Sequence, residues 1–309
     1  MDFQKIIRVE KPQAYLDNAF HNARQKAPKS SSIRDPAVRV RLNERQKIKV
    51  VAASLTNSLD KILTSFPQFD ALPEFYQELV KAMLDYRQLK KSLGAITWAQ
   101  KQIGILHKKA TIGMKSRNVN EIIQQRTVYY GRVASVIKQI SPALEYLEQV
   151  RKTMRTFPNI KPGLKTIVIL GFPNTGKTTL LSKLTTAKPK IAAYPFTTQT
   201  INTGYATQGS KTLQILDTPG TLNRYEKMNP IEKQAIISIK LADCIVYVFD
   251  PTEEYPIDQQ IKLYKKLLAM HKQVVVFLSK TDLVSTSEFE IYQPFTDPEK
   301  LKAHLFSLS

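Results

Sequence analysis

Residues 166–178 read T-I-V-I-L-G-F-P-N-T-G-K-T and give the clearest indication of fold class in this chain. Residues 166–170 are a short β-branched and apolar run, typical of a strand buried on both faces of a sheet. Residues 171–178 fit the pattern G-x-x-x-x-G-K-[ST], and leucines at helical spacing follow them. A strand, a glycine loop and a helix in this order predict a phosphate-binding loop in an α/β domain.

The residue types of this loop suit nucleotide phosphates. Glycines let the backbone curl and aim its N–H groups at oxyanions, and the helix N-terminus adds the positive end of a dipole. We expect Lys177 to reach the β- and γ-phosphates and the Thr178 hydroxyl to ligate Mg²⁺. The loop residues expected to bind the nucleotide are Gly171, Asn174, Thr175, Gly176, Lys177, Thr178 and Thr179.

Two further motifs are expected to sense the γ-phosphate. In Y-P-F-T-T at residues 194–198, a hydroxyl can ligate Mg²⁺, and we favour Thr198 over Thr197. The next predicted strand ends in D-x-x-G, where Asp217 would hold the magnesium shell and the Gly220 N–H would contact the γ-phosphate. The expected catalytic residues are Lys177, Thr198 and Gly220, and the expected metal ligands are Thr178, Thr198 and Asp217.

Residues 279–282, S-K-T-D, stand where a guanine-reading motif N-K-x-D belongs. Asp282 can accept hydrogen bonds from N1–H and the 2-amino group of guanine, whereas adenine would leave the carboxylate unpaired. The stem of Lys280 can pack over the base. Ser279 replaces the usual Asn, which weakens a contact that ties neighbouring loops together.

The end of the chain is expected to be a strand. The run from Leu305 to Ser309 would enter a degenerate S-A-x motif beside the base, with Ser307 and Leu308 as nucleotide contacts. The helix that normally covers this part of the sheet is then expected to be missing. Either the C-terminus is truncated or that end of the sheet is bare.

The sequence predicts two domains of different class. Strands alternate with helices over residues 161–309, which implies a mostly parallel, covered sheet. Residues 1–160 read as an all-helical bundle, with Asp35-Pro36 as a strong start signal for a helix through Ser65. A further helix is expected from Pro73 to Leu93, ended or bent by Gly94. Aromatics at helical spacing are expected mainly in the core, although they could stack on bases: Phe75, Tyr76, Trp98, Tyr129 and Tyr130.

Charge is distributed unevenly along the 309 residues. Residues 1–165 hold 30 Lys and Arg against 13 Asp and Glu, a net +17 out of +20 for the chain. This asymmetry indicates a polyanionic partner for the helical half, so we expect RNA or a ribonucleoprotein surface. No zinc-finger, RRM or KH signature indicates a sequence-specific reader.

The sequence has none of the features of a membrane-spanning, secreted or disulfide-stabilised protein. No apolar run approaches the length of a membrane span, and the N-terminus lacks the apolar core of a signal peptide. The single cysteine, Cys244, excludes an internal disulfide and suits a reducing compartment. In the helical half, His21 and His107 are isolated, so no cluster of metal ligands is expected there.

The motifs G-F-P-N-T-G-K-T, Y-P-F-T-T and D-T-P-G resemble the Obg-type branch of translation-factor GTPases. Within it, P-E-F-Y at 73–76 and Y-L-E-Q-V-R at 146–151 followed by P-N-I at 158–160 resemble the nucleolar GTP-binding protein (Nog) family. The resemblance implies a Ras-like GTPase domain that binds GTP or GDP with Mg²⁺. It also implies a factor that binds precursor large ribosomal subunits, contacting rRNA and ribosomal proteins. The long C-terminal extension of eukaryotic members is absent, so an archaeal-type, cytoplasmic member is favoured over a nucleolar one.

We therefore expect a GTPase of ribosome biogenesis that is monomeric off the ribosome. Thr221, just after D-x-x-G, is too short to orient water, so intrinsic hydrolysis should be slow and stimulated by the ribosomal partner or a cation. Asn174 matches a pattern of potassium-activated relatives and would help bind K⁺, or it only ties its own loop. The alternatives are a GTPase of a tRNA or other RNA-processing assembly, and a nucleotide-gated RNA-binding protein with little hydrolysis.

Overall fold

The structure, a computed structural model, describes residues 3–26, 35–116, 118–161, 163–185, 190–192, 201–218, 237–252, 255–270, 273–283 and 287–308. Contacts between residues divide the chain into two compact units. One is helical and comprises Gln4–Gln68 and Asp85–Lys152. The other contains the sheet and comprises the chain through Phe3, Phe69–Leu84 and Thr153–Ser309. The fold class expected from the sequence, helices followed by a phosphate-loop domain with a mostly parallel sheet, is confirmed.

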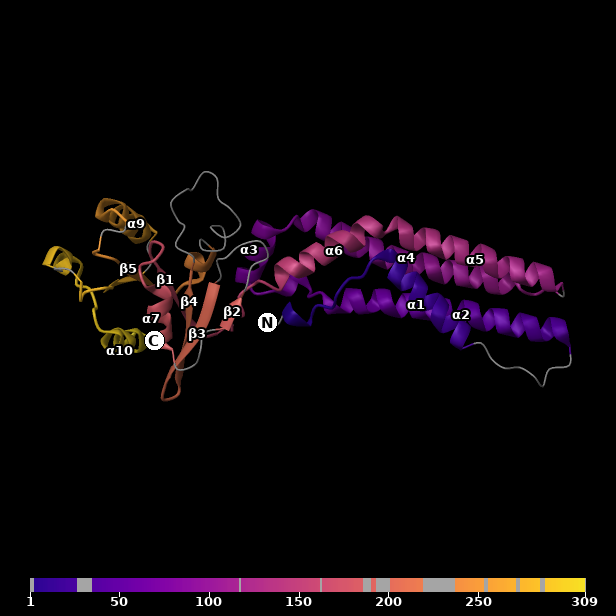
Figure 1. The fold of residues 1–309 in the computed structure, drawn as a ribbon, viewed down its shortest axis with the longest axis horizontal. Coiled ribbons are helices and arrows are strands. Elements are labelled where there is room, and N and C mark those ends of the chain that lie inside the picture. The colour runs from indigo at the N-terminus through magenta and orange to yellow at the C-terminus, as the bar shows by residue number, and fades with distance from the viewer. Residues whose placement is uncertain are drawn as a thin grey trace. The chain divides into compact units, whose positions relative to one another are not determined.

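Long antiparallel helices make up the helical unit (Figure 1). In it α2 packs against α1, α4 and α5. The N-cap expected at Asp35 is present, because its Oδ1 accepts the backbone N–H of Ala37 at 2.8 Å. The helices of the first half are α1 (Pro12–Gln25), α2 (Pro36–Ser65), α3 (Glu74–Met83), α4 (Tyr86–Gly113), α5 (Val119–Gln139) and α6 (Ser141–Met154).

The single helix expected from Pro73 to Leu93 is wrong, because α3 and α4 are separate helices. The break falls at Leu84 and Asp85, where the Asp85 side chain accepts the N–H of Gln88 at 2.9 Å and caps α4. Gly94 lies inside α4. A helix N-cap contributes about 1 kcal/mol, enough to set this boundary, whereas the similar penalty of one interior glycine is absorbed by a 28-residue helix.

The aromatic residues of the first half do not all lie in the core. Phe75, Tyr76 and Tyr129 are buried, as expected. Trp98 is 41% exposed on α4, so its expected place in the core is wrong. Helical spacing defines a face of a helix, but the packing partner decides whether that face is covered.

The second unit is built on one sheet with the strand order β2-β3-β4-β1-β5-β6. Strand β1 runs parallel to both β4 and β5, while β3 is antiparallel to β2 and β4. The strands are β1 (Lys165–Leu170), β2 (Lys190–Ala192), β3 (Ile201–Gln208), β4 (Lys211–Asp217), β5 (Cys244–Phe249) and β6 (Gln273–Leu278). Every residue of β5 is buried, as befits a strand covered on both faces.

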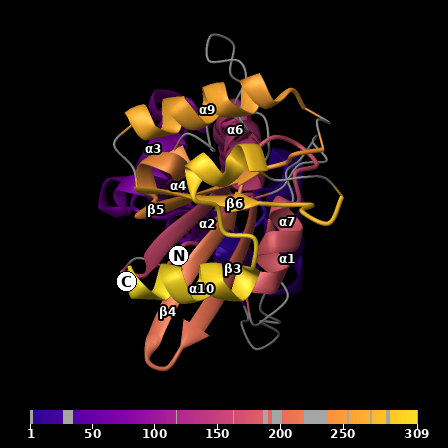
Figure 2. The ribbon, with the colours of Figure 1, turned by 90° about the vertical axis from the view of Figure 1, so that its left-hand side faces the viewer.

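Helices cover both faces of the sheet. α7 (Lys177–Leu184) and α10 (Pro298–Ser307) contribute Leu181 and Leu301 to one core cluster with residues of β1, β4, β5 and β6. On the other face, Tyr247 of β5 donates a hydrogen bond to Gln260 O of α9 (Ile257–Ala269) at 2.8 Å. Figure 2 shows α9 and α10 on opposite sides of the sheet. Parallel pairing of β1 with β4 and β5 brings the carboxyl ends of these three strands to one edge of the sheet.

The end of the chain corrects the expectation of a strand at Leu305–Ser309. The described residues there form the last turns of α10, which begins after Asp297 with Pro298 at its first position. The helix that was expected to be missing is therefore present. The same Asp-Pro signal that starts α2 also starts α10, and the Asp297 carboxylate accepts the N–H of Glu299 at 2.8 Å. The place beside β6 is taken by Phe295, which forms a parallel bridge to Phe277.

The segment that leads into β1 is fixed to the sheet by hydrogen bonds. The Lys161 N–H donates to the Gln214 Oε1 atom at 2.8 Å, and the Gln214 amide in turn donates to Thr166 Oγ1 at 3.2 Å. The Tyr205 hydroxyl donates to Asn159 O at 3.1 Å. Gln214 is fully buried on β4. Residues 159–161 are therefore held by β3 and β4.

We expect Gly94→Ala to raise the free energy of unfolding by about 1 kcal/mol, because alanine has the better helix propensity. A Cβ at Gly94 would meet nothing within 4 Å, so no clash offsets this gain. Denaturant unfolding followed by circular dichroism measures the change. Gly204→Ala is the contrasting control and should destabilise, since its Cβ would lie 2.4 Å from Thr185 Cγ2. Equal effects of the two substitutions would contradict this account.

Candidate nucleotide-binding site

The loop between β1 and α7 has the curled backbone that a phosphate site requires. Gly176 has φ 85° and Asn174 has φ 60°, both in the left-handed region. Asparagine is among the few residues besides glycine that tolerate this region. At Gly171 a side chain is excluded, because a Cβ would lie 2.7 Å from the Val248 carbonyl oxygen of β5. Gly171 is therefore required because β5 lies too close for a side chain, and Gly176 is required because of its left-handed backbone conformation.

Lys177, the first residue of α7, is buried with 7% of its surface exposed. Its Nζ atom donates a hydrogen bond to the Phe172 carbonyl oxygen within the loop at 2.5 Å. Burial lowers the pKa of Lys177, and the nearby charge of Asp217 opposes this shift in part. A buried ammonium group held inside the loop is suited to pair with phosphate oxygens, which would compensate its lost hydration.

The two described residues expected to bind Mg²⁺ are in contact. Thr178 Oγ1 donates to Asp217 Oδ2 at 2.6 Å, and Asn202 Nδ2 donates to the same oxygen at 3.2 Å. Pairing of β1 with β4 places Asp217 opposite Ile169, next to the start of the loop. Burial raises the pKa of Asp217, opposed by these two hydrogen bonds and by the charge of Lys177.

The Asp217 Oδ1 atom gives a second test of whether these residues fit a cation. It is buried and has no hydrogen-bond partner in the part of the chain that the structure describes. A buried carboxylate oxygen without a partner is costly, and a hard cation with oxygen ligands satisfies it. Thr178 and Asp217 therefore fit a magnesium ion that completes its shell with phosphate oxygens and water.

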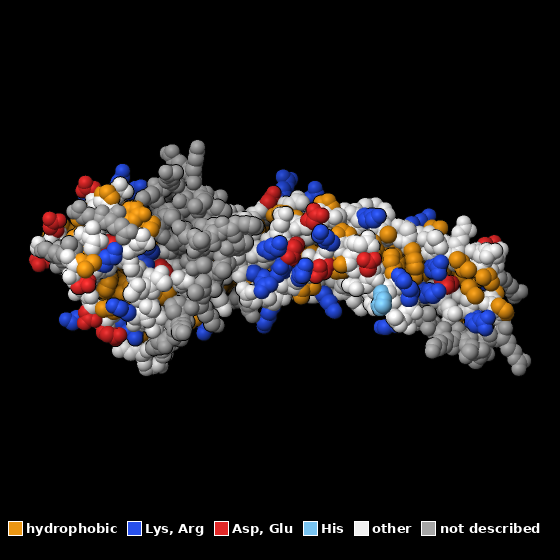
Figure 3. Space-filling view, in the orientation of Figure 1, with side chains coloured by type: hydrophobic (Ala, Val, Ile, Leu, Met, Phe, Trp, Pro, Cys, Tyr) orange, Lys and Arg blue, Asp and Glu red, His pale blue; other side chains and the backbone are white. Residues whose placement is uncertain are grey.

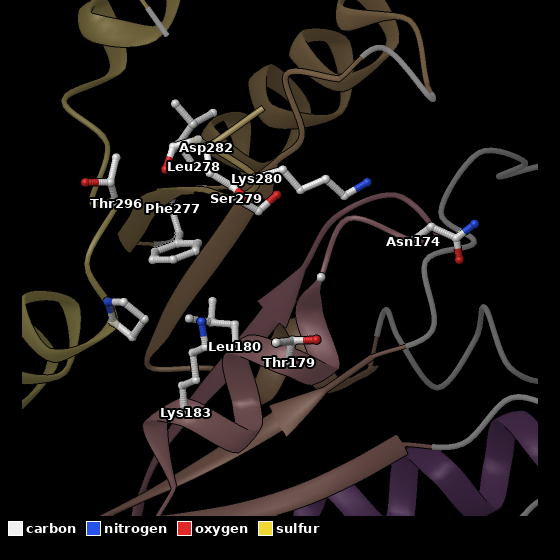
Figure 4. A pocket seen from close by; sticks show the side chains of 13 residues that line it. Asn174, Thr179, Leu180, Lys183, Phe277, Leu278, Ser279, Lys280, Asp282 and Thr296 are labelled. Atoms are coloured by element: carbon white, nitrogen blue, oxygen red, sulfur yellow. The ribbon is translucent and has the colours of Figure 1, made fainter. Parts of the chain in front are cut away.

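A pocket of about 390 Å³ lies between the phosphate loop and the segment after β6 (Figure 4). Asn174, Gly176 and Thr179 line it from the loop and α7, and Lys280 and Asp282 line it from the other side. The structure thus brings the expected guanine-reading residues next to the phosphate loop. In Figure 4 the Asn174 side chain points away from Asp282.

Ser279, in the place of the usual Asn, donates through its Oγ atom to the Phe249 carbonyl oxygen of β5 at 2.9 Å. A Cβ at Gly176 would lie 3.8 Å from its Cβ atom. Ser279 therefore lies beside the phosphate loop. Its side chain is shorter than that of asparagine, and its hydroxyl group donates to β5.

Lys280 is held by an ion pair that the sequence did not reveal. Its Nζ atom lies 2.6 Å from Asp250 Oδ2 at the end of β5. Burial raises the pKa of Asp250, but hydrogen bonds from Lys280 and Thr252 outweigh it and the pKa is lowered overall. Lys280 has φ 51°. The Asp250 carboxylate therefore positions Lys280 at the wall of the pocket.

Other site residues were missed or are placed differently from the expectation. Thr296 and Pro298 line the pocket, and the signal for them was the Asp297-Pro298 helix start just beside them. Ser307 and Leu308 are not among the lining residues, so their expected role as base contacts is not supported. The Ser307 hydroxyl donates to His304 O at 2.7 Å within α10.

The remaining expected residues divide into two groups. The Thr175 side chain is buried and donates to Phe172 O at 2.9 Å, so only its backbone can face a ligand. Thr198, Gly220 and Thr221 lie outside the described residues.

Within the described residues there is no group of three or more His, Cys, Asp or Glu that could hold a metal by protein ligands alone. Among the helices that the structure describes, we find no candidate for a membrane span.

Comparison with known proteins places these features in a family. Residues 3–161 match the NOG1 N-terminal helical domain, and residues 166–280 match the family described as 50S ribosome-binding GTPase. An uncharacterised protein of Methanocaldococcus jannaschii is 35% identical over 91% of this chain and 81% of its own length. A probable nucleolar GTP-binding protein 1 of Dictyostelium discoideum is 29% identical over 97% of this chain.

The nucleolar GTP-binding protein 1 of Saccharomyces cerevisiae is 28% identical over 94% of this chain. The chain spans 46% of the length of each of these two eukaryotic relatives. Both parts of the chain, the helical region and the phosphate-loop domain, thus match in order and over nearly their whole extent. The chain therefore belongs to the nucleolar GTP-binding protein 1 family of P-loop GTPases.

Proposed function

We propose that this protein is a GTP-binding and GTP-hydrolysing switch that binds precursor large ribosomal subunits and acts in ribosome biogenesis. The contact of Thr178 with Asp217, next to the buried Lys177, carries the nucleotide part of the proposal. The basic helical region and the names of the relatives support the ribosomal part.

The residues of the loop bind and orient the phosphates. The N–H groups of the curled backbone and the N-terminus of α7 face the oxyanions, and Lys177 would pair with the β- and γ-phosphates. Magnesium, when bound through Thr178 and Asp217, would neutralise charge on the phosphate oxygens. The protein's own contribution is to hold these groups in place before the nucleotide arrives, which lowers the reorganisation cost of hydrolysis.

Lys161 is hydrogen-bonded to β4 and Asn159 to β3. These bonds support a mechanical connection between the nucleotide site and the segment that precedes β1. Strand β4 ends at Asp217. A change at Asp217 on nucleotide binding would therefore act on the strand that holds residue 161. Such a link is what a switch requires.

Asp282→Asn should change the base preference of the site. The asparagine amide can still accept N1–H, but its NH₂ group opposes the 2-amino group of guanine and matches the 2-carbonyl group of xanthine. We expect GTP affinity to fall at least about tenfold and xanthosine triphosphate affinity to rise, because two N–H donors that face each other are both left unpaired. Competition with a fluorescent GTP analogue measures both, and the exposed Asp258→Asn on α9 is the control. Unchanged preference would remove Asp282 from the base-reading role.

A second prediction concerns Asn174. We expect it to help bind K⁺ beside the phosphates, and we expect the bound ion to accelerate hydrolysis. Turnover in KCl should exceed turnover in NaCl at equal ionic strength, since the ion supplies positive charge at the developing anion. Asn174→Gly keeps the left-handed backbone conformation and should change the K⁺ effect only if the side chain contributes. Equal turnover in the two salts would dispose of the K⁺ site.

The ribosomal partner should bind in a nucleotide-dependent way. We expect more protein to co-sediment with large ribosomal subunits in a non-hydrolysable GTP analogue than in GDP, at two salt concentrations, because the partner recognises the GTP-bound state. Small subunits serve as the control. Binding that ignores the nucleotide and disappears with modest salt would indicate only attraction to a polyanion.

Experiments on the protein and the ribosomal particle also distinguish two other functions from the proposed one. RNA crosslinks dominated by tRNA would favour a GTPase of a tRNA or other RNA-processing assembly. Tight GTP binding without turnover, even on the particle, would favour a nucleotide-gated RNA-binding protein. On the main proposal intrinsic hydrolysis is slow and the particle stimulates hydrolysis. A stimulated-to-basal ratio near one would therefore count against the main proposal.

On the main proposal the protein is also monomeric off the ribosome. It acts in the cytoplasm if it is archaeal and in the nucleolus if it is eukaryotic.

A further inference from the structure

The side of α4 that faces away from the helical core carries a regular row of exposed residues, here called the α4 face. Its members alternate at spacings of three and four residues, which places them in one stripe along the helix: Lys91, Gly94, Trp98, Lys101, Ile105, Lys108 and Ile112. The buried residues of α4 lie on the opposite side: Leu89, Ser92, Ile96, Ala99, Ile103 and Ala110.

Three large apolar side chains on the α4 face are exposed to water. Trp98 is 41% exposed, Ile105 is 43% exposed and Ile112 is 64% exposed. Single exposed apolar residues are common on protein surfaces. Three of them at seven-residue intervals lie on one side of the helix, about 10 Å apart along its axis, with Lys101 and Lys108 between them.

The charge of α4 indicates the chemistry of the partner. Its 28 residues include six Lys and Arg and no Asp or Glu. Next to it on α2, Arg45 and Lys49 lie close enough to His107 to lower its pKa further, in addition to the larger effect of burial. Positive charge is therefore also present on the neighbouring helix, beside the side of α4 that faces the core. Figure 3 shows Lys and Arg side chains beside hydrophobic ones on the visible face of the helical unit.

Gly94 leaves the helix bare one turn before Trp98. It is exposed, and a Cβ there would meet nothing within 4 Å. A glycine inside a helix costs about 1 kcal/mol relative to alanine, so this residue is unfavourable for α4 itself. Its effect on the surface is a stretch of α4 without a side chain, one helical turn before Trp98.

We propose that the α4 face binds unpaired bases of RNA, with Trp98 as the stacking platform and Lys101 and Lys91 on the adjoining phosphates. This rests on the proposed function and names the surface by which the helical unit contacts an RNA-containing particle. Aromatic rings interleaved with cations are how proteins hold single-stranded nucleic acid without reading its sequence. A second copy of the chain fits this face poorly, because its own row of lysines would meet the same row.

The single tryptophan of the chain makes the test direct, since its emission reports Trp98 alone. The probes are an RNA stem-loop with an unpaired purine loop and heparin, which has negative charge but no bases. Excitation at the red edge of the absorption band avoids the tyrosines. The stem-loop should quench and shift the emission, and heparin at equal charge should not. Equal quenching by both would overturn the proposal.

Variants test the same contact by anisotropy of the labelled stem-loop. Trp98→Ala should weaken binding about tenfold, because stacking on one base is lost, while Trp98→Phe should retain most of the affinity. Lys101→Ala should lower the slope of log affinity against log salt by about one contact. The controls on α9 remove an exposed leucine and an exposed lysine, Leu268→Ala and Lys265→Ala, and should leave binding unchanged. Wild-type affinity of Trp98→Ala would contradict the proposal.

Co-sedimentation of the same variants separates this proposal from the proposed function. If Trp98→Ala binds large subunits as the wild type does, the α4 face is not the contact and the proposed function stands. If the stem-loop binds through Trp98 but no subunit binds, the α4 face stands and the ribosomal function fails. If Trp98→Ala loses the subunits while the stem-loop never binds the wild type, the occupant is a protein and the RNA proposal is overturned.

Discussion

Two buried side chains of opposite charge, Lys177 and Asp217, set the physical constraint on which the nucleotide site depends. Burial lowers the pKa of the lysine and raises that of the aspartate, so both charged forms are disfavoured by loss of water. Their mutual attraction repays part of this cost, but one Asp217 oxygen has no partner within the described residues. Anionic phosphates would stabilise the charge of the lysine, and a divalent cation would stabilise that of the aspartate and bind its unpartnered oxygen.

The sheet keeps these two charges in place. Strand β1 pairs in parallel with β4 and β5, so the phosphate loop, Asp217 and Asp250 all follow the carboxyl ends of neighbouring strands. Asp250 holds Lys280 at the wall of the pocket, which connects the base side of the site to the same sheet edge. On β4, the buried Gln214 lies three residues before Asp217 and holds Lys161. Asp217 of the candidate nucleotide site and the contact that holds the segment before β1 therefore lie on one strand.

Local signals in the sequence predicted much of this arrangement. Asp35-Pro36 gave the start of α2, and the strand-loop-helix around residue 171 gave the phosphate loop with Thr178 near Asp217. The strand expected at Leu305 failed because a short apolar run has no period that separates strand from helix. The Asp297-Pro298 cap nearby was the better signal.

Other features could not be found from the sequence because they depend on packing. Trp98 has the spacing of a core residue, yet no helix covers its side of α4 among the described residues. The pairing of Lys280 with Asp250 joins residues thirty positions apart. Only the parallel register of β5 and β6 brings them together. The sites that depend on Thr198 and Gly220 lie outside the described residues and stay predictions.

We expect this pocket to select guanine nucleotides through Asp282 and to hold them with magnesium at Thr178 and Asp217. Displacement of a fluorescent GTP analogue by GTP, GDP and ATP, with and without Mg²⁺, tests this expectation most directly. We expect GTP and GDP to displace the analogue and ATP to fail, with GTP affinity falling when Mg²⁺ is removed. Equal displacement by ATP, or affinity for GTP that does not respond to Mg²⁺, would contradict the account.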